Sequence, residues 1–173
     1  MQKNIGKKVV LVLNFPNNPT GYSPRVSEVK KLKETLLESA ESGSQFVVVC
    51  DDAYFGMVYE NDCEKQSIYY HMANCHKNIV TVKIDGSTKE CFSWGFRVGF
   101  ITLAIKGAKQ ETYHAFEQKI GGAIRSLVSN INHPLQTLLL ESLNHKNFEK
   151  ESTQLVETLK GRYVETKKCV TNP

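Results

Sequence analysis

Lys89 and Arg97 stand eight residues apart in a segment whose pattern suits chemistry on a carbonyl group. The segment, residues 82–102, opens on an apolar-alternating run, breaks at residues 85–88, and continues with Arg97 in a second strand-like run. A lysine amine condenses with a carbonyl to form an imine, and an arginine holds an anionic group nearby. A surface lysine with an ordinary ion-pair partner gives the same local pattern, so the rest of the chain must decide.

Four apolar runs predict the strands that position these residues. They cover residues 9–13, 46–50, 78–82 and 98–103, and continuous runs of this kind are typical of parallel strands buried on both faces. Helical spacing predicts helices over residues 27–43, 67–74, 108–120, 133–143 and 148–170. The first helix is expected to begin at Ser23 or Ser27 and to stop at Gly43, and the third to close at Gly121-Gly122. This order predicts an α/β doubly wound layer.

Polar residues follow three of these strands directly. Asn18 lies in a loop after the first strand, Asp51 and Tyr54 follow the second, and Lys89 follows the third. The loop at residues 14–21 holds two prolines, a glycine and three asparagines, which exclude regular structure. Ligands of open α/β sheets bind outside the carboxyl ends of the strands. We therefore expect these side chains to converge on one site.

The composition is that of an ordinary globular domain. The 173 residues are 40% hydrophobic and 23% charged, with a net charge of +4. The lysine clusters at 30–33 and 167–168 fall in predicted helices, so a solvated face is expected and no nucleic-acid partner. The chain has no apolar run of membrane-spanning length and no signal peptide, so no membrane association is expected.

The five cysteines are odd in number, widely spaced and form no CxxC pair. This pattern indicates reduced thiols in a cytoplasmic protein. His71, Cys75 and His76 lie close together, but their spacing matches no standard zinc pattern. We therefore expect no metal site.

With these residues in place, the chain resembles the fold-type-I pyridoxal-phosphate enzymes, in particular the class I/II aminotransferases. The matching stretches are Asn17–Gly21, Asp51–Tyr54, Ser87–Lys89 and Gly95–Gly99. Each is moderately specific alone, and their order and separation together are highly specific. The resemblance covers nearly the whole chain. It implies part of the large domain of the aspartate aminotransferase-like fold, a mostly parallel sheet flanked by helices.

The resemblance implies a role for each matching residue. Lys89 matches the lysine that forms the internal aldimine with pyridoxal 5′-phosphate and then shuttles the substrate proton. Asp51 matches the carboxylate that pairs with the pyridine nitrogen and lets the ring act as an electron sink. Asn18 and Tyr54 match the two groups that hydrogen-bond the cofactor's 3-oxygen. Arg97 matches the arginine that grips the phosphate.

The resemblance also implies a hydroxyl contact to the phosphate from Ser87 or Thr88. Family members often carry a serine three residues before the lysine, where this chain has Gly86. The chain departs from the family pattern at this position, directly before the third matching stretch.

Substrate and subunit partners follow from the same resemblance. The family is homodimeric and acts on amino acids and 2-oxo acids. Arg125 resembles an arginine of aspartate-type enzymes that reaches into the partner subunit's site and holds a substrate's distal carboxylate. An arginine in this position is also a common structural ion-pair partner. Arg125 favours a dicarboxylic substrate, and Trp94 with Phe96 favours an aromatic-tolerant pocket.

Family members are more than twice this long, so the resemblance divides the chain in two. Residues 1–145 match the C-terminal half of the cofactor-binding large domain, and residues 146–173 match a linking helix toward a small domain. The family's phosphate-binding helix N-terminus, ring-stacking aromatic and α-carboxylate arginine have no counterpart here. We therefore expect weak cofactor binding and little or no transaminase activity from the chain alone. Exposed sheet edges favour self-association.

Other functions share these motifs. A β-lyase, a decarboxylase or a cyclising synthase uses the same cofactor, which carries the chemistry. A non-catalytic aminotransferase-like sensor domain belongs to a different class, although the intact Lys89, Asp51 and Arg97 argue against it. A plain α/β binding domain leaves the Lys89 constellation unexplained.

Overall fold

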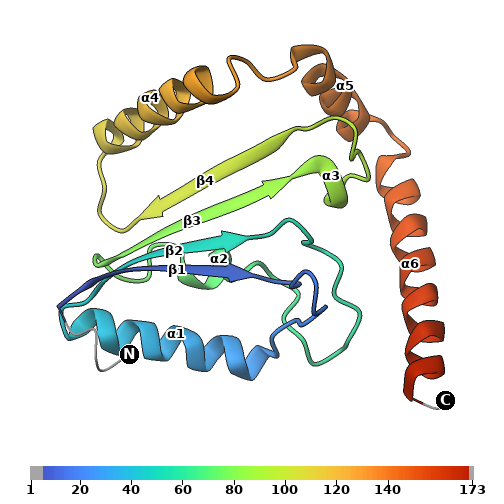
Figure 1. Cartoon of the computed structure of the whole chain (residues 1–173), viewed down its shortest axis with the longest axis horizontal. Coiled ribbons are helices and arrows are strands. Elements are labelled where there is room, and N and C mark those ends of the chain that lie inside the picture. The colour runs from blue at the N-terminus through green and yellow to red at the C-terminus, as the bar shows by residue number, and fades with distance from the viewer. Residues whose placement is uncertain (1–5, 172–173) are drawn as a thin grey trace.

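A four-stranded sheet in the order β1-β2-β3-β4 lies at the centre of the computed structural model, which describes residues 6–171 (Figure 1). The strands are β1 (Lys8–Asn14), β2 (Gln45–Asp51), β3 (Ile79–Gly86) and β4 (Gly99–Ile105). The first three pair in parallel, and β4 runs antiparallel to β3. The four predicted strands and the mostly parallel sheet are therefore confirmed. The ends of the predicted division, residues 1–5 and 172–173, lie outside the described residues.

Six helices accompany the sheet in the described part of the chain. They are α1 (Val26–Glu41), α2 (Ile68–Met72), α3 (Ser87–Glu90), α4 (Gln110–Leu127), α5 (His133–Asn144) and α6 (Phe148–Thr171). Gly43 stops α1 as predicted, with a φ of +96° that a residue with a side chain rarely adopts. Within residues 6–171, no helix is both long and apolar enough to cross a membrane.

Two predicted helix ends are wrong. The N-cap of α1 is Arg25 and not Ser23 or Ser27. The Glu28 carboxylate stabilises this helix start by accepting a hydrogen bond from the Arg25 backbone N–H at 2.7 Å. Helix α4 continues through Gly121-Gly122 to Leu127. Each interior glycine costs only about 0.5–1 kcal/mol relative to alanine, so two of them weaken a helix of this length without ending it.

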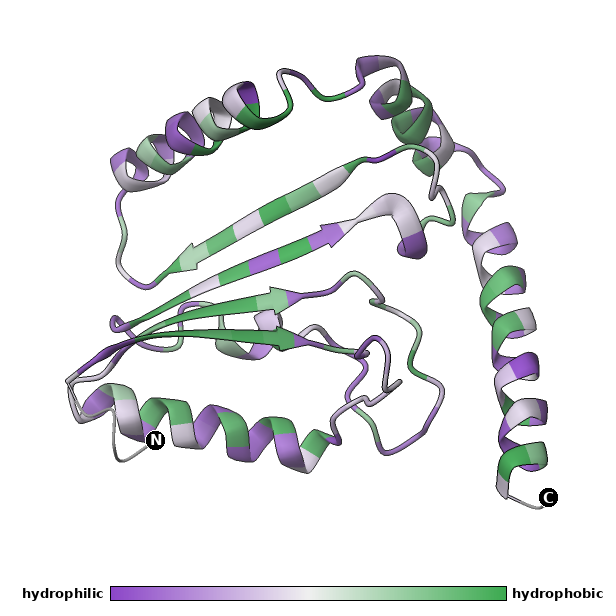
Figure 2. Cartoon of the chain, viewed as in Figure 1, coloured by the Kyte–Doolittle hydropathy of each residue, from purple (hydrophilic) through white to green (hydrophobic). Residues whose placement is uncertain are grey.

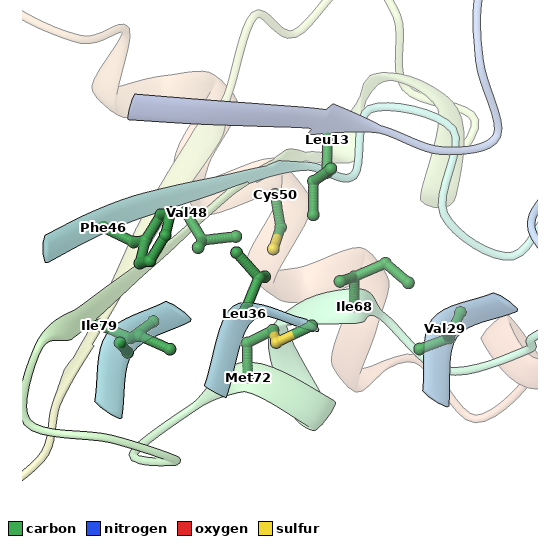
Figure 3. Close-up of a cluster of buried hydrophobic side chains, with 10 residues drawn as sticks. Leu13, Val29, Leu36, Phe46, Val48, Cys50, Ile68, Met72 and Ile79 are labelled. Atoms are coloured by element: carbon green, nitrogen blue, oxygen red, sulfur yellow. The ribbon is translucent and has the colours of Figure 1, made fainter. Parts of the chain in front are cut away.

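One face of the sheet carries the core. Helices α1 and α2 lie against this face, and Leu36, Val48 and Met72 are fully buried between the layers (Figure 3). The cluster consists of Leu13, Val29, Leu36, Ala40, Phe46, Val48, Cys50, Ile68, Met72 and Ile79. Burial of each large aliphatic side chain contributes about 1.5–3 kcal/mol. This layer fixes the carboxyl ends of β1, β2 and β3 relative to one another.

The other face of the sheet is apolar and open. The strand register places aliphatic side chains on this face, namely those of Val10, Val12, Val47, Val49, Val80, Val82, Ile84, Ile101, Leu103 and Ile105. Val10 and Val12 are 69% and 62% exposed, although the sequence pattern predicts strands buried on both faces. Helix α4 follows β4 along the chain (Figures 1 and 2). It buries none of its own side chains. The predicted burial of β1 on both faces is therefore wrong, because no described element packs over β1 on this face.

Candidate functional site

A hollow of about 830 Å³, open to solvent, lies at the carboxyl ends of β2 and β3. We call it the polar hollow, and the side chains that line it include Asp51, Tyr54, Thr88, Lys89 and Arg97. Asn18 lies outside its lining and joins this group through a hydrogen bond to Tyr54. These side chains lie together because parallel strands deliver their carboxyl ends to the same edge of the sheet.

Lys89 lies in the four-residue helix α3, which begins directly after β3. The sequence predicts a break in regular structure at residues 85–88, whereas the structure continues β3 to Gly86 and forms one helical turn over Ser87–Glu90. The Ser93 hydroxyl donates to the Ser87 carbonyl at 2.9 Å, which ties this turn to the chain that follows it. The Lys89 amine lies 5.5 Å from the centre of the Tyr54 ring, within range of a cation–π contact.

Asn18 and Tyr54 meet although 36 residues separate them. The Asn18 side-chain amide donates to the Tyr54 hydroxyl at 3.1 Å. The Asn14 side-chain oxygen in turn accepts from the Asn18 backbone N–H and from the Asn17 amide, each at 3.1 Å. The proline- and asparagine-rich loop is thus closed on itself, and it presents one amide to Tyr54. Asn18, Tyr54 and Lys89 form a continuous chain of contacts.

Asp51 ends β2, in register with Asn14 on one side and Ile84 on the other. One carboxylate oxygen accepts a hydrogen bond from the Ala53 backbone N–H at 3.1 Å. Among the described residues, nothing hydrogen-bonds the second oxygen. A half-buried carboxylate with one free oxygen lining a hollow can accept a proton-bearing nitrogen.

Asp52 faces away from this hollow, because successive strand residues point to opposite faces. It is 4% exposed, and burial raises the pKa of its carboxyl, while a hydrogen bond from Ser67 acts in the opposite direction. Its second oxygen has no hydrogen-bond partner in the described chain. The two adjacent aspartates therefore differ in role: Asp51 serves the hollow, and Asp52 belongs to the layer beneath it.

Arg97 lines the polar hollow from the turn before β4. Its φ is +57°, so it lies outside the strand in which the sequence places it. An arginine in this left-handed region costs on the order of 1–3 kcal/mol, and such strain concentrates at ligand sites. No carboxylate within residues 6–171 forms an ion pair with it, which leaves the guanidinium available to an anion.

The two candidate hydroxyls are separated by the fold. Ser87 is 1% exposed, and its hydroxyl donates to the Val98 carbonyl at 3.3 Å, away from the hollow. Thr88 lines the hollow. Gly86 opposes Gly99 across the β3–β4 pair, and a Cβ on Gly86 would lie 3.0 Å from the Val98 carbonyl oxygen. A serine at this position would require the backbone to move, which explains the departure from the family pattern.

Arg125 is not brought to the site. It is exposed in the last turn of α4, and neither hollow next to Lys89 includes it. The structure instead places residues of α6 along a second hollow that Lys89 also lines, among them Leu155, Leu159 and Arg162. No motif marks these residues in the sequence, where α6 has the pattern of a charged amphipathic helix. Trp94 also lines this second hollow, and Phe96 lines neither hollow.

One residue of the histidine and cysteine cluster, His71, lies against an acidic side chain. His71 Nε2 lies 3.1 Å from a Glu64 carboxylate oxygen, which ties α2 to the preceding loop. Across residues 6–171, no three histidine, cysteine or acidic side chains gather in a way that would hold a metal ion.

Comparisons with known proteins agree with this geometry. The family model described as "Aminotransferase class I and II" matches residues 1–170. Aspartate aminotransferase of Pyrococcus horikoshii is 26% identical over 162 residues, which cover 93% of this chain and 35% of the relative. The solved structure of an aminotransferase from Anaerococcus prevotii is 25% identical with a TM-score of 0.71, over 88% of this chain and 37% of that one.

A third comparison concerns a protein with its cofactor in place. The aromatic-amino-acid aminotransferase of Burkholderia pseudomallei, solved covalently bound to pyridoxal phosphate, is 19% identical with a TM-score of 0.62. The match covers 91% of this chain and 37% of that one, and it shows the shared fold. The chain thus spans about a third of the length of the relatives it matches.

Proposed function

The chain belongs to the class I and II aminotransferase family, and we propose that it forms part of a pyridoxal-phosphate-dependent enzyme that moves an amino group from an amino acid to a 2-oxo acid. One observation carries this proposal. Lys89, Arg97 and the pair Asp51 and Tyr54 come from three chain segments and line one hollow. A surface lysine with an ordinary ion-pair partner does not account for two further features of this hollow. The Arg97 guanidinium has no ion-pair partner among the described residues, and the Asp51 carboxylate has one oxygen without a hydrogen bond.

The hollow fits the cofactor's chemistry at each end. Arg97 would hold the phosphate, with the Thr88 hydroxyl beside it, because a planar guanidinium matches phosphate oxygens. Asp51 would hold the pyridine nitrogen through its free oxygen, and Asn18 with Tyr54 would hold the ring's 3-oxygen. When bound, pyridoxal phosphate supplies a carbonyl and an electron sink.

The chain's own residues supply positioning and proton transfer. Lys89 offers an amine that binds a carbonyl and, once free, holds and returns a proton at Nζ. The Tyr54 ring restrains that amine from 5.5 Å, and the Asn18 amide fixes the Tyr54 hydroxyl. The Asp51 carboxylate is oriented by the Ala53 N–H. Each group is held by a second contact, which favours a defined geometry.

The division of the chain belongs to the same proposal. Residues 1–145 serve as one part of a cofactor-binding domain, and residues 146–173 as a helix that leads away from it. The chain alone then binds cofactor weakly and turns over little substrate, because the relatives' remaining two thirds have no counterpart in it. The exposed sheet edges and the open apolar face support self-association, as in a homodimer. All five cysteines are free, which suits a reducing compartment such as the cytoplasm.

The test is chemical labelling of the purified chain. Mixing with pyridoxal phosphate, reduction with borohydride and peptide mass spectrometry are expected to give one adduct, on Lys89. Replacement of Lys89 by alanine removes the adduct, Arg97→Gln reduces its yield, and Lys30→Ala on the exposed surface of α1 changes neither. Adducts spread over surface lysines, or equal yields with and without Arg97, would overturn the proposal.

A further inference from the structure

We infer that Asp52, Lys83 and Asp85 form a buried cluster that binds one proton, and that this proton leaves when the negative charge of Asp51 is neutralised. We call these three residues the Asp52 cluster. Their side chains lie on the face of the sheet that carries the core, opposite the side chain of Asp51. This role goes beyond the proposed function, because Asp52 lines neither of the hollows that Lys89 lines.

The strand register brings the two aspartates of the cluster together. Asp51 and Ile84 are partners in the parallel pair of β2 and β3, and Asp52 and Asp85 follow them at the same level. The Asp52 backbone N–H donates to the Ile84 carbonyl at 2.8 Å, which continues the pairing beyond the end of β2. Lys83 lies two residues before Asp85 in β3, so its side chain points to the same face.

The Asp52 cluster holds more carboxylates than cations. The Lys83 amine forms an ion pair with Asp85, and these two side chains are 20% and 11% exposed. The same amine lies 5.5 Å from the centre of the Phe55 ring. Asp52 is the most deeply buried of the three, at 4% exposure.

Two carboxylate oxygens of the cluster are left without a partner. One oxygen of Asp52 and one of Asp85 are buried and accept no hydrogen bond in the described part of the chain. One ammonium group balances only one of the two carboxylates, and a buried charge without a partner is costly. Because Lys83 pairs with Asp85, the proton that removes the excess charge belongs on Asp52.

Neighbouring charges act on that proton from both faces of the sheet. Burial raises the pKa of the Asp52 carboxyl, and a hydrogen bond from Ser67 and the charge of Lys83 act in the opposite direction. The negative charges of Asp85 and Asp51 raise this pKa further. The affinity of Asp52 for a proton therefore depends on the charge of Asp51, although the two side chains point to opposite faces.

The other ionisable groups around the cluster do not supply the missing positive charge. Burial raises the pKa of the Cys50 thiol to about 12, so this group stays neutral. Glu90 of α3 is a further carboxyl near the cluster and adds negative charge when it ionises. Glu64 lies against His71, and the Lys65 amine donates to two backbone carbonyls of the loop before it.

A small hollow gives the proton a route to solvent on the core side of the sheet. It has a volume of about 320 Å³, and Asp52, Phe15, Phe55 and Ser67 line it. It shares no residue with the polar hollow, which Asp85 lines instead. The Asp52 cluster therefore lies between two separate hollows, and its proton can exchange while the polar hollow is filled.

The cluster links the pH on one face of the sheet to the charge on the other. A cation that pairs with Asp51 removes the repulsion that favours the proton on Asp52, and the proton then leaves through the small hollow. By linkage, a higher pH favours the binding of a cation at Asp51. This consequence rests on the proposed function, which places a protonated ring nitrogen beside that carboxylate.

The titration of Asp52 can be measured directly. The purified chain, labelled with 13C at its aspartate carboxyl carbons and free of cofactor, is followed by NMR as the pH is raised. We expect one aspartate to titrate with a midpoint above the ordinary value of 3.8, and its signal to be absent from Asp52→Asn. Asp51→Asn and Asp85→Asn should each lower that midpoint, because each removes a negative charge. Asp62→Asn, at an exposed carboxylate, is the matched control and should leave it unchanged.

Three outcomes would overturn the inference: no aspartate titrates above 3.8, the raised midpoint persists in Asp52→Asn, or Asp51→Asn leaves it unchanged. Circular dichroism establishes that each variant is folded. Asp51→Asn keeps the ion pair of Lys83 with Asp85, so the coupling is measured even where Asp85→Asn unfolds.

The borohydride adduct on Lys89 is measured separately, since the titration uses no cofactor. An adduct together with an ordinary titration of Asp52 means that the proton-binding cluster is wrong and the proposed function holds. A raised midpoint that falls in Asp51→Asn, without an adduct on Lys89, means that the proposed function fails instead.

Discussion

The sheet part of the molecule, residues 6–105, and the helical part, residues 106–171, are held together in different ways. In the sheet part, α1 and α2 cover one face, and side chains such as Leu36 and Met72 are completely buried. In the helical part, α4 and α6 bury no side chain, and α5 buries Leu139 alone. The difference indicates that hydrophobic burial holds the first part, whereas a few polar and aromatic contacts place the second.

The site draws on both parts. Asp51, Tyr54, Lys89 and Arg97 belong to the sheet part, where the core fixes their positions. Helix α6 belongs to the helical part, and Leu155 and Leu159 of this helix line a second hollow that Lys89 also lines. One Glu60 carboxylate oxygen accepts hydrogen bonds from the Tyr163 hydroxyl and the Lys167 amine of α6, and we call this contact the Glu60 clamp. Cofactor binding in the polar hollow is therefore expected to survive substitutions that loosen α6.

The largest difference between the two parts is expected in the free energy of unfolding. Leu36→Ala empties a fully buried position and should cost about 2–5 kcal/mol. Leu127→Ala on α4, where the side chain is 82% exposed, should change stability by no more than about 0.5 kcal/mol. Urea denaturation followed by circular dichroism measures both. Equal losses would mean that the helical part is packed as tightly as the sheet.

Thiol reactivity gives the next largest effect. Burial, and secondarily the nearby Asp52 carboxylate, raises the pKa of the Cys50 thiol to about 12, whereas Cys169 is exposed on α6. Only the thiolate reacts, so at pH 8 Cys50 should label at least about a hundredfold more slowly than Cys169. An aromatic disulfide reagent with peptide mapping measures the two rates. Comparable rates in the folded chain would show that the sheet core opens as readily as α6 moves.

The smallest effect concerns the clamp and depends on pH. Hydrogen bonds from Lys167 and then Tyr163 lower the pKa of the Glu60 carboxyl, so the folded state favours the charged form. A lowered pKa stabilises the docked helix above the ordinary glutamate value of 4.5, and the effect is lost as the pH falls through the lowered value. Hydrogen exchange of α6 amides should therefore be faster in Glu60→Gln than in the parent chain at pH 7, and alike in both at pH 3.

Glu165→Gln is the matched control for this comparison. Glu165 pairs with Lys168 at 2.9 Å within α6, and an exposed pair of this kind contributes little. Exchange in this variant is expected to follow the parent chain at both pH values. If both variants behave alike, the docking of α6 depends on apolar contacts of residues such as Leu155 and Leu159 instead of the Glu60 clamp.

The sequence predicts the residues at strand ends well. Asn18, Asp51, Tyr54 and Lys89 each follow an apolar run or its loop, and parallel pairing then brings the run ends together. It does not predict the position of α6 beside the sheet part, because the contact that places this helix joins Glu60 and Tyr163 across 103 residues. It also does not distinguish Ser87 from Thr88, since that depends on which hydroxyl meets the Val98 carbonyl.

The sequence by itself determined the order of helices and strands, the mostly parallel sheet and the family, because periodicity and short motifs are local properties of the chain. Tertiary structure decided the rest. Packing of α1 and α2 on one face left the other face open, and the close approach of the Val98 carbonyl oxygen to Gly86 left little room for a side chain there. The docking of α6 placed Leu155 and Leu159 along a hollow that Lys89 also lines, whereas Arg125 of α4 lies outside it. These outcomes depend on long-range contacts, which a local pattern does not contain.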